Sequence, residues 1–442
     1  MATTYLHWTP SNAGNRRTWT FSAWVKVPNA SGRLLSGGSH ISNGPMHNLD
    51  FLTNRHLRVE DTGSDGLGNN YINIRTNRVF RDPASWYHIV VAVDTTQSTA
   101  SDRVKIYVNG EQETSFSTAT YPSQNYETSI NMTNQQIIGA RAVSSSGTYF
   151  SGLMTHVNFV DGAALTPSSF GLTNATTGEW SINPAPNVTY GTNGYFILKD
   201  GNSVTDQSPN TNNFTVGGGS LTLTKDNPSN NFAVWDSNTQ SSGTYSNANL
   251  SKNGGDDMCA TLGVTSGKWY WETKKTNTGG SFHAGITCHD SSSGHVTQFL
   301  SGTNTVNSSA IWIREDGLVT GRDKAGYTSS HSHTDNFSSM SNGDIMAFAL
   351  DLDSGTKKLT YYKNGSEVGY STFSYGGTVP VFPFFRMNTG CSGTANFGNG
   401  YFETDAITTN SGNGYAGAEG ASKFYYQPPT GHKALTTKGI NS

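Results

Sequence analysis

Apolar side chains in this sequence recur at every second position in short runs, and this alternation restricts the fold more than any other feature. In TWTFSAWVKV (residues 18–27) the alternate residues from Trp19 to Val27 are apolar, so one face of an extended strand would enter a core. SWYHIVVAVD (85–94) is apolar almost throughout, as expected for a strand covered on both faces. Convincing amphipathic helices are missing, and the single helix-start signal, near Thr166, predicts one short turn.

A hairpin pattern occurs twice. Residues 102–116 read DRVKIYVNGEQETSF and residues 357–369 read KKLTYYKNGSEVG, each with a one-faced apolar strand, an Asn-Gly pair and a second strand. Asn-Gly best tolerates the positive φ angles of a type I′ turn. Short strands separated by turn residues predict β-sandwiches. We therefore expect an all-β fold with one sandwich architecture used twice.

The 442 residues are enough for two or three domains with sizeable cores. We expect a first β-sandwich over 1–200 and a second over 232–400. Residues 201–231 are rich in Asn, Gly, Ser and Pro, which predicts a connector with one short strand at 220–224. Residues 401–442 are glycine-rich and then carry Pro428-Pro429, which favours an extended C-terminal arm.

The composition excludes several classes of protein. Only 13% of the residues are charged, against about 25% in ordinary soluble proteins, and the net charge of −3 gives no reason to expect a nucleic-acid partner. No apolar run has the roughly 20 residues that a membrane span needs, and the start, MATTYLHWTP, lacks the pattern of a secretory signal. The three cysteines, Cys259, Cys288 and Cys391, have no CxxC spacing, so we expect neither a disulfide framework nor a zinc site.

The first region resembles the laminin-G/concanavalin A-like jelly-roll family. The segments that carry this resemblance are WTFSAWVKV, WYHIVVAVD followed directly by RVKIYVNGEQ, then QIIGA and HVNFVDGAALTPSSFG. The usual first strand, before YLHWTPS, is shortened, so the sheet edge is expected to be completed by another segment or another chain. The resemblance implies a jelly-roll β-sandwich.

The second region resembles a SPRY/B30.2 domain. Its matching segments, in order, are SGKWYWE, HAGIT, GDIMAFALDLDSGTKKLTYYKNGSEVG, VPVFPFFRM and ANFG. SPRY domains are sandwiches related in shape to the concanavalin A-like set, so this resemblance agrees with the repeated hairpin.

No constellation of catalytic residues is evident, and we expect a protein that is not an enzyme. Hydrolases of the concanavalin A-like set carry an E-x-D-x-E strand; here Glu272 stands alone, and Glu315 and Asp316 are adjacent and would face opposite sides. No G-x-S-x-G elbow or phosphate loop occurs. Cys288 and His289 are neighbours on a strand and would also diverge, so a buried structural cysteine is the better interpretation.

Calcium is the one cofactor for which the sequence offers ligands. VEDTGSDGLGNN holds Glu60, Asp61 and Asp65 among glycine turns, which suits a cation that takes six to eight oxygens. The spacing is not that of an EF-hand loop, and Asp256 with Asp257 in NGGDDM is a weaker candidate. Solvated turn acids explain these residues equally well, and no other cofactor is expected.

Candidate ligand-binding residues lie in DKAGYTSSHSHTDNF. His331, His333 and Asp335 alternate, so they would share one face of a strand as metal ligands could, although the flanking Ser and Thr favour an exposed loop. Tyr327 is the best candidate for an exposed aromatic contact, because SPRY domains bind through rim loops. We therefore predict ligand contacts at Tyr327, His331 and His333.

The order of the two domains resembles that in virion structural proteins of tailed bacteriophages: a laminin-G-like region ending in GTNGYFILKD, an NNF connector, a SPRY region and PPTGHKALTT. This resemblance implies a virion location, in a tail fibre or head fibre that adheres to host surface glycans. It also implies other virion proteins as partners and a homo-oligomer, with a trimer favoured. The alternative is a virion decoration or connector protein that uses its sandwiches for protein–protein contacts.

Overall fold

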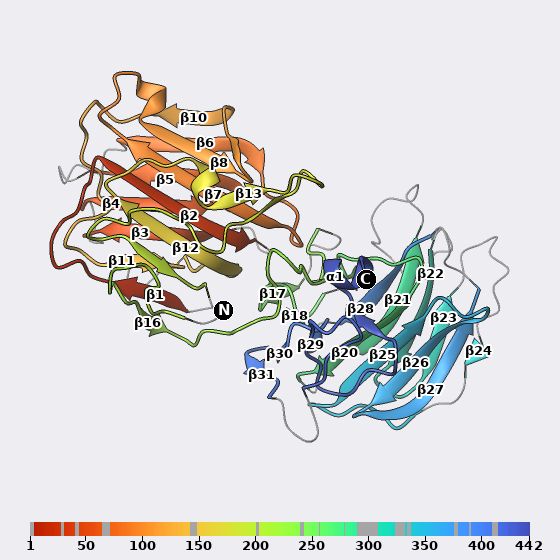
Figure 1. The fold of residues 1–442 in the computed structure, drawn as a ribbon. Coiled ribbons are helices and arrows are strands. Elements are labelled where there is room, and N and C mark those ends of the chain that lie inside the picture. Colours follow the sequence, from red (N-terminus) through yellow and green to blue (C-terminus); the bar gives the residue numbers. More distant parts are fainter. Residues whose placement is uncertain are drawn as a thin grey trace. The chain divides into compact units, whose positions relative to one another are not determined.

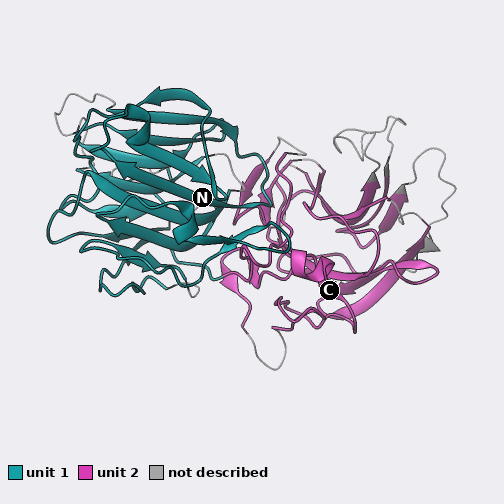
Figure 2. Cartoon of the chain, turned by 45° about the horizontal axis from the view of Figure 1, so that its top comes forward, with its two compact units in different colours: residues 1–223 teal, residues 224–442 magenta. Residues whose placement is uncertain are grey.

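The computed structural model describes residues 4–27, 31–39, 44–63, 71–141, 148–199, 203–238, 243–255, 257–277, 279–289, 308–322, 332–333, 337–374, 379–388, 390–408 and 414–442. The chain divides into two compact units, residues 1–223 and 224–442 (Figure 2). Each unit is built from two sheets packed face to face, which confirms the predicted all-β fold with two sandwiches. No helix among these residues is long and apolar enough to cross a membrane.

The first unit pairs an eight-stranded sheet with a six-stranded sheet (Figure 1). The eight-stranded sheet has the order β10 (Phe116–Thr120), β6 (Ile72–Val79), β5 (His56–Asp61), β4 (Met46–Phe51), β3 (Gly32–Gly38), β11 (Gln136–Ile138), β1 (Tyr5–Trp8) and β16 (Thr215–Gly218). The six-stranded sheet has the order β15 (Tyr195–Ile197), β12 (Leu153–Asp161), β2 (Thr18–Lys26), β7 (Trp86–Asp94), β8 (Val104–Val108) and β9 (Glu111–Gln112). A small pair, β13 (Gly171–Thr173) with β14 (Trp180–Ile182), and two 3-10 turns, Ala100–Asp102 and Pro167–Ser169, complete the regular elements described.

The alternation in the sequence corresponds to the two faces of the six-stranded sheet. Trp19 and Phe21 on β2 point into the core between the sheets, together with the apolar residues that follow them at every second position. On β7, Val91 faces that core, whereas Val90 faces outward under Phe170 from the segment that follows β12. β7 is therefore covered on both faces, as its uninterrupted apolar sequence predicted.

Both predicted hairpins form with the expected turn geometry. Asn109 and Gly110 have φ angles of 50° and 87°, and Asn364 and Gly365 have 49° and 85°. Both central residues of each turn therefore lie in the left-handed region, as a type I′ turn requires. The predicted helical turn near Thr166 is the 3-10 turn Pro167–Ser169.

The short first strand gains its second neighbour from a distant part of the same chain. β1 pairs with β11 on one side and with β16 on the other, with Leu6 opposite Val216. The strand in this region lies at Thr215–Gly218 and not at the expected residues 220–224. Pairing with β1 explains the difference, because it places Val216 and its neighbours in a ladder although the glycine-rich sequence has little strand propensity of its own. The sheet edge is thus completed by a segment and not by another chain.

The second unit also has two main sheets. The first has the order β17 (Thr244–Ser246), β18 (Ser251–Asn253), β29 (Ser392–Asn396), β20 (Lys268–Lys275), β25 (Ile345–Asp351), β26 (Lys357–Lys363), β27 (Ser366–Phe373) and β24 (Ser332–His333), with β32 (Lys433–Ala434) pairing parallel to β20. The second has the order β19 (Met258–Cys259), β28 (Val381–Met387), β21 (Phe282–His289), β22 (Ser308–Arg314) and β23 (Val319–Arg322). β30 (Tyr401–Phe402) pairs with β31 (Asp405–Ala406), and α1 (Thr437–Ile440) is a single turn. Trp235, Trp271 and Phe385 fill the space between the two sheets.

The C-terminal segment packs onto the second unit. The buried carboxylate of Glu272, in the middle of β20, accepts hydrogen bonds from the backbone N–H groups of Tyr425 (2.9 Å) and Tyr426 (2.7 Å). β32 adds to the same sheet, and the side chain of Leu435 lies in the core. Residues 414–442 therefore belong to the second sandwich.

Candidate functional site

The structure separates the residues that the sequence predicted as a calcium site. Glu60 and Asp61 are consecutive on β5, and Asp61 points between the sheets while Glu60 points to the outer face of the eight-stranded sheet. Asp65 lies outside the described residues, so the calcium prediction stays a prediction. Within the part of the chain that is described, no group of three or more His, Cys, Asp or Glu side chains is placed to hold a metal ion.

The predicted ligand-binding residues of the second unit fall in a segment of which little is described. Tyr327 and His331 lie outside the described residues. His333 belongs to β24, whose backbone pairs with β27 opposite Ser371. The predicted contacts at these three residues therefore stay predictions.

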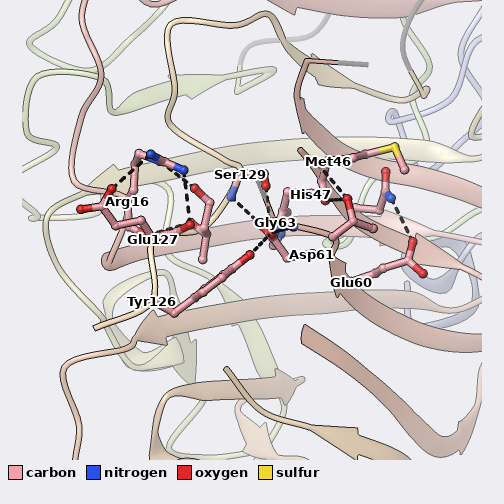
Figure 3. A network of polar contacts seen from close by, with 12 residues as sticks. Arg16, Met46, His47, Glu60, Asp61, Gly63, Tyr126, Glu127 and Ser129 are labelled. Carbon is pink, nitrogen blue, oxygen red and sulfur yellow. Dashed lines mark hydrogen bonds and ion pairs between the residues drawn. The ribbon is translucent and has the colours of Figure 1, made fainter. Parts of the chain in front are cut away.

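Asp61 is the centre of a buried hydrogen-bond network at one end of the first sandwich (Figure 3). Its Oδ1 accepts from the backbone N–H of Gly63 (3.0 Å), the Tyr126 hydroxyl (2.7 Å) and the Ser129 hydroxyl (2.8 Å). Its Oδ2 accepts from the backbone N–H of Ser129 (2.7 Å) and lies 3.0 Å from Nδ1 of His47. A carboxylate offers about four lone-pair positions, and these five partners occupy them in the described structure. Asp61 is a structural anchor.

This network ties together segments that are far apart in the sequence. The rings of Tyr71 and Tyr126 stack with centroids 5.3 Å apart. Gly63 has a φ of 70°, and a Cβ at this position would clash with the Tyr71 ring at 2.5 Å. Burial and the nearby Asp61 carboxylate raise the pKa of Tyr126, so its hydroxyl keeps its proton and donates to Asp61. The end of β5 and residues 126–129 are therefore held rigidly at this rim.

Charged residues on the outer face of the same sheet form an ion-pair ladder. Arg58 donates from Nε and Nη2 to the two oxygens of Asp50 (3.0 and 2.9 Å) and from Nη1 to Glu60 (2.6 Å). Asn48 donates from Nδ2 to the other oxygen of Glu60 (3.0 Å). On the far side of Asp50, Nη1 of Arg33 lies 3.5 Å from the carboxylate. No sequence motif marks Arg33, Asp50 or Arg58 as neighbours, because pairing between separate strands brings them together. The available signal was the alternation of charged with apolar residues in HLRVED.

A serine and a histidine lie within hydrogen-bond distance on the outer face of the six-stranded sheet. Oγ of Ser22 is 2.8 Å from Nε2 of His88, and Nε1 of Trp180 is 2.9 Å from Nδ1 of His88. An indole N–H can only donate, so Nδ1 is unprotonated and Nε2 carries the proton that it donates to Ser22. Burial lowers the pKa of His88 to about 3. The histidine therefore has no free lone pair with which to activate Ser22, and the arrangement is a structural tie under Trp180.

The acids and cysteines of the second unit that the sequence suggested as catalytic candidates also have structural surroundings. The acids have protein partners, and the cysteines are buried. Oε2 of Glu315 accepts from the backbone N–H of Phe282 (2.6 Å), and Asp316 pairs with Arg314 (2.7 Å). Cys259, Cys288 and Cys391 form no disulfide bond with one another, and all three are buried. Burial raises the pKa of the Cys391 thiol to about 11, so it stays protonated near neutral pH and is a poor nucleophile.

Comparison with protein families agrees with this architecture. Residues 1–169 match the family described as the concanavalin A-like lectin/glucanases superfamily, of laminin-G type, and residues 268–400 match the SPRY domain. The chain therefore contains a laminin-G-type concanavalin A-like domain followed by a SPRY domain. Together they fit a β-sandwich binding module. No curated protein matches the chain.

Solved structures that are similar to the chain or to one of its domains include three animal proteins. A heptameric SAP-like pentraxin from Limulus polyphemus is 16% identical, with a TM-score of 0.30, and the match covers 48% of this chain and 88% of the pentraxin. Domains LG4-5 of the mouse laminin alpha1 chain are 8% identical, with a TM-score of 0.28, covering 96% of this chain and 92% of theirs. The SPRY domain of human HERC1 is 16% identical, with a TM-score of 0.26, covering 36% of this chain and 96% of that domain.

Proposed function

We propose that this chain is a non-enzymatic bacteriophage virion appendage, a tail fibre or head fibre, that adheres to host surface glycans through its β-sandwiches. The observation that carries the binding part is the rigid rim of the first sandwich, where the buried Asp61 carboxylate holds two distant segments with hydrogen bonds from Gly63, Tyr126 and Ser129. A rim fixed in this way presents neighbouring groups at little entropic cost on binding.

The proposal that the chain is not an enzyme is supported by the hydrogen bonds that its candidate reactive groups already make within the chain. Nε2 of His88 donates to Ser22, the Asp61 carboxylate is filled by donors from its own chain, and Glu315 holds a backbone N–H. Each of these groups would have to break a buried or partly buried hydrogen bond before it acted on a substrate, which is costly.

The virion setting is supported by the order of sequence motifs alone, with a laminin-G-like region, a connector and a SPRY region in one chain. Other virion proteins and a homotrimer are the partners that this setting implies. A single shallow saccharide site would bind weakly, with a Kd near 1 mM or about −4 kcal/mol. Presentation of several copies on one particle would raise the avidity by roughly 10²–10⁴.

The test is a glycan array probed with the full chain coupled to beads at high valency, run beside an assay for newly released reducing ends. The proposal expects saccharide binding without release of reducing ends. Release of reducing ends from a bound polysaccharide would show an enzyme. The competing function is a virion decoration or connector, in which the SPRY domain contacts another protein. For that function the expected result is no glycan binding and tight binding to another virion component.

A further inference from the structure

A group of aromatic side chains lies on the outer face of the eight-stranded sheet, at the edge where β16 pairs with β1 (Figure 1). The side chain of Leu6 on β1 enters the core, so its neighbours Tyr5 and His7 project from the opposite face of the sheet. The Tyr5 ring centroid is 5.9 Å from that of His7 and 6.4 Å from that of Tyr149, and the ring planes are inclined by 38° and 40°. Tyr5, His7 and Tyr149 therefore form one aromatic patch, although Tyr149 comes from a distant part of the sequence.

The two tyrosine rings of the patch are held in place by packing within the chain. Tyr5 and Tyr149 pack against the buried side chains of Ile137 and Ala140. A Cβ at Gly217 on β16 would lie 2.1 Å from the Tyr5 ring, so the ring occupies space that only a glycine leaves open. The patch is therefore formed before a ligand arrives, and little side-chain entropy is lost on binding.

The polar tips of the three side chains are open to water and have no partner among the described residues. Nε2 of Gln135 lies 2.9 Å from Nδ1 of His7. An amide N–H can only donate, so Nδ1 is the acceptor and the imidazole proton lies on Nε2. This Nε2–H and the hydroxyls of Tyr5 and Tyr149 make no hydrogen bond with the described part of the chain, and none of these atoms is buried. Three hydrogen-bonding groups are thus available to a ligand.

The patch differs from an ordinary exposed aromatic residue in two respects. A single exposed ring is common on protein surfaces and needs no explanation, but here three half-buried rings are adjacent. They also combine apolar ring surface with a few polar groups, as small-molecule sites do. The residues paired with Tyr5 and His7 on this face are the uncharged Ile137, Thr215 and Gly218, so the ligand that suits the patch is neutral.

We propose that this aromatic patch binds a neutral hexopyranose unit of a glycan. The inference rests on the proposed function and specifies the place of contact and the class of sugar. One face of such a sugar presents C–H groups, whose slight positive charge favours packing on the negative face of an aromatic ring. Its hydroxyls fit the hydroxyls of Tyr5 and Tyr149, which both donate and accept, and the Nε2–H of His7, which donates.

The test measures binding of the full chain to bead-bound cellohexaose, mannohexaose and galactohexaose, which are neutral, and to hexagalacturonate, which is charged. Tyr5→Ala and Tyr149→Ala each remove a ring, whereas Tyr5→Phe and Tyr149→Phe keep the ring and remove the hydroxyl. Gly217→Ala keeps all three rings but displaces that of Tyr5. Tyr121→Ala is the matched control, because Tyr121 is a half-buried tyrosine that packs against the same core and follows β10, at the opposite edge of the sheet.

The inference expects binding to at least one neutral chain. Tyr5→Ala and Tyr149→Ala should each weaken that binding roughly 3- to 10-fold, the loss expected for one aromatic contact, and the two Phe variants should weaken it less. Gly217→Ala should also weaken it, because the Tyr5 ring can no longer lie in its native position, whereas Tyr121→Ala should not. The Phe variants should keep the native thermal midpoint, because their rings still pack, so they decide the outcome if an Ala variant does not fold.

Native affinity in folded Tyr5→Ala and Tyr149→Ala, or in both Phe variants, would overturn this site and leave the proposed function standing. An equal loss in Tyr121→Ala would do the same, because it would assign the effect to the stability of the unit. Binding to hexagalacturonate alone, or binding on the glycan array without binding to any neutral hexose chain, would overturn the neutral-sugar assignment only. Failure to bind any saccharide, on the beads or on the array, would overturn the proposed function and this inference together.

Discussion

Replacement of Asp61 by asparagine tests the account of the first sandwich most directly. The two side chains have nearly the same shape, so Asp61→Asn changes charge and hydrogen bonding without opening a cavity. In the native chain Oδ1 accepts from Gly63, Tyr126 and Ser129, and Oδ2 accepts from the backbone N–H of Ser129 and lies beside His47. An asparagine has one oxygen and one NH2 group, and the NH2 group cannot accept.

The asparagine amide can take two orientations, and the one that costs less stability determines the size of the destabilisation. With the new NH2 group at the Oδ2 position, His47 can change tautomer and accept from it, but the Ser129 backbone N–H is left facing a donor. One buried, unsatisfied N–H costs about 1–3 kcal/mol. The three remaining hydrogen bonds lose their ionic partner and weaken by a few tenths to about 1 kcal/mol each. Relief from burying a charge offsets part of this loss, so we expect a net destabilisation of about 2–4 kcal/mol.

Differential scanning calorimetry of the full chain measures this loss. For a unit of roughly 200 residues, each kcal/mol lowers the midpoint by about 2–4 °C, so the first unit should unfold about 4–16 °C earlier. The control is Asp102→Asn, which removes an exposed pair with Lys105 and should cost less than about 1 kcal/mol. Tyr126→Phe removes one of the five partners and should fall between the two variants.

An unchanged or raised midpoint in Asp61→Asn would refute this reasoning. Such a result would mean that the carboxylate is a buried charge whose cost exceeds the gain from its donors. Asp61 would then serve a purpose other than stability, and the predicted calcium site is the first candidate.

Three further outcomes are expected. Burial raises the pKa of Glu272 from 4.5 to about 7, so its contribution to stability falls as the pH rises through that interval. Chemical denaturation should therefore show a lower unfolding free energy at pH 8 than at pH 5 from this residue in the native chain, and Glu272→Gln should remove that difference. Burial lowers the pKa of His88 from 6.5 to about 3, so stability from this residue is lost as the pH falls from 6.5 towards 3, and His88→Gln should remove that part of the acid sensitivity. Gly110 has a φ of 87° and a Cβ there would lie 2.7 Å from the Trp180 ring, so Gly110→Ala should cost about 2–4 kcal/mol in the unfolding free energy. Gly162→Ala is its control, with a φ of 96° and open space, and a cost near 1 kcal/mol; equal losses in the two variants would contradict the packing argument.

Local pattern was sufficient to predict the strands that form the two cores. The alternation around Trp19 and the two Asn-Gly turns depend on neighbours in the chain, and the structure confirms both. The pairing of β1 with β16 and the addition of β32 to β20 depend on contacts between distant segments of low strand propensity. No local periodicity marks such segments as strands, so the sequence alone predicted a connector and a free arm there.

The candidate sites were harder to predict for the same reason. Consecutive acids such as Glu60 and Asp61 attract attention in a sequence, but a strand sends them to opposite faces, where each finds different partners. Arg33 is brought beside Asp50 by strand register and carries no motif. Its buried, unpaired N–H groups are visible only when the surrounding side chains are placed.

The last strand of the eight-stranded sheet has a practical consequence for work on the isolated first domain. A recombinant fragment that ended at residue 200 would contain every strand of the six-stranded sheet but would lack β16, which occupies the outer side of β1. The backbone groups of Tyr5, Leu6 and His7 would then be open to any extended peptide. Two such fragments could join there and pass for a natural dimer, so an expression boundary at residue 223 is the safer choice for measuring how the domain assembles.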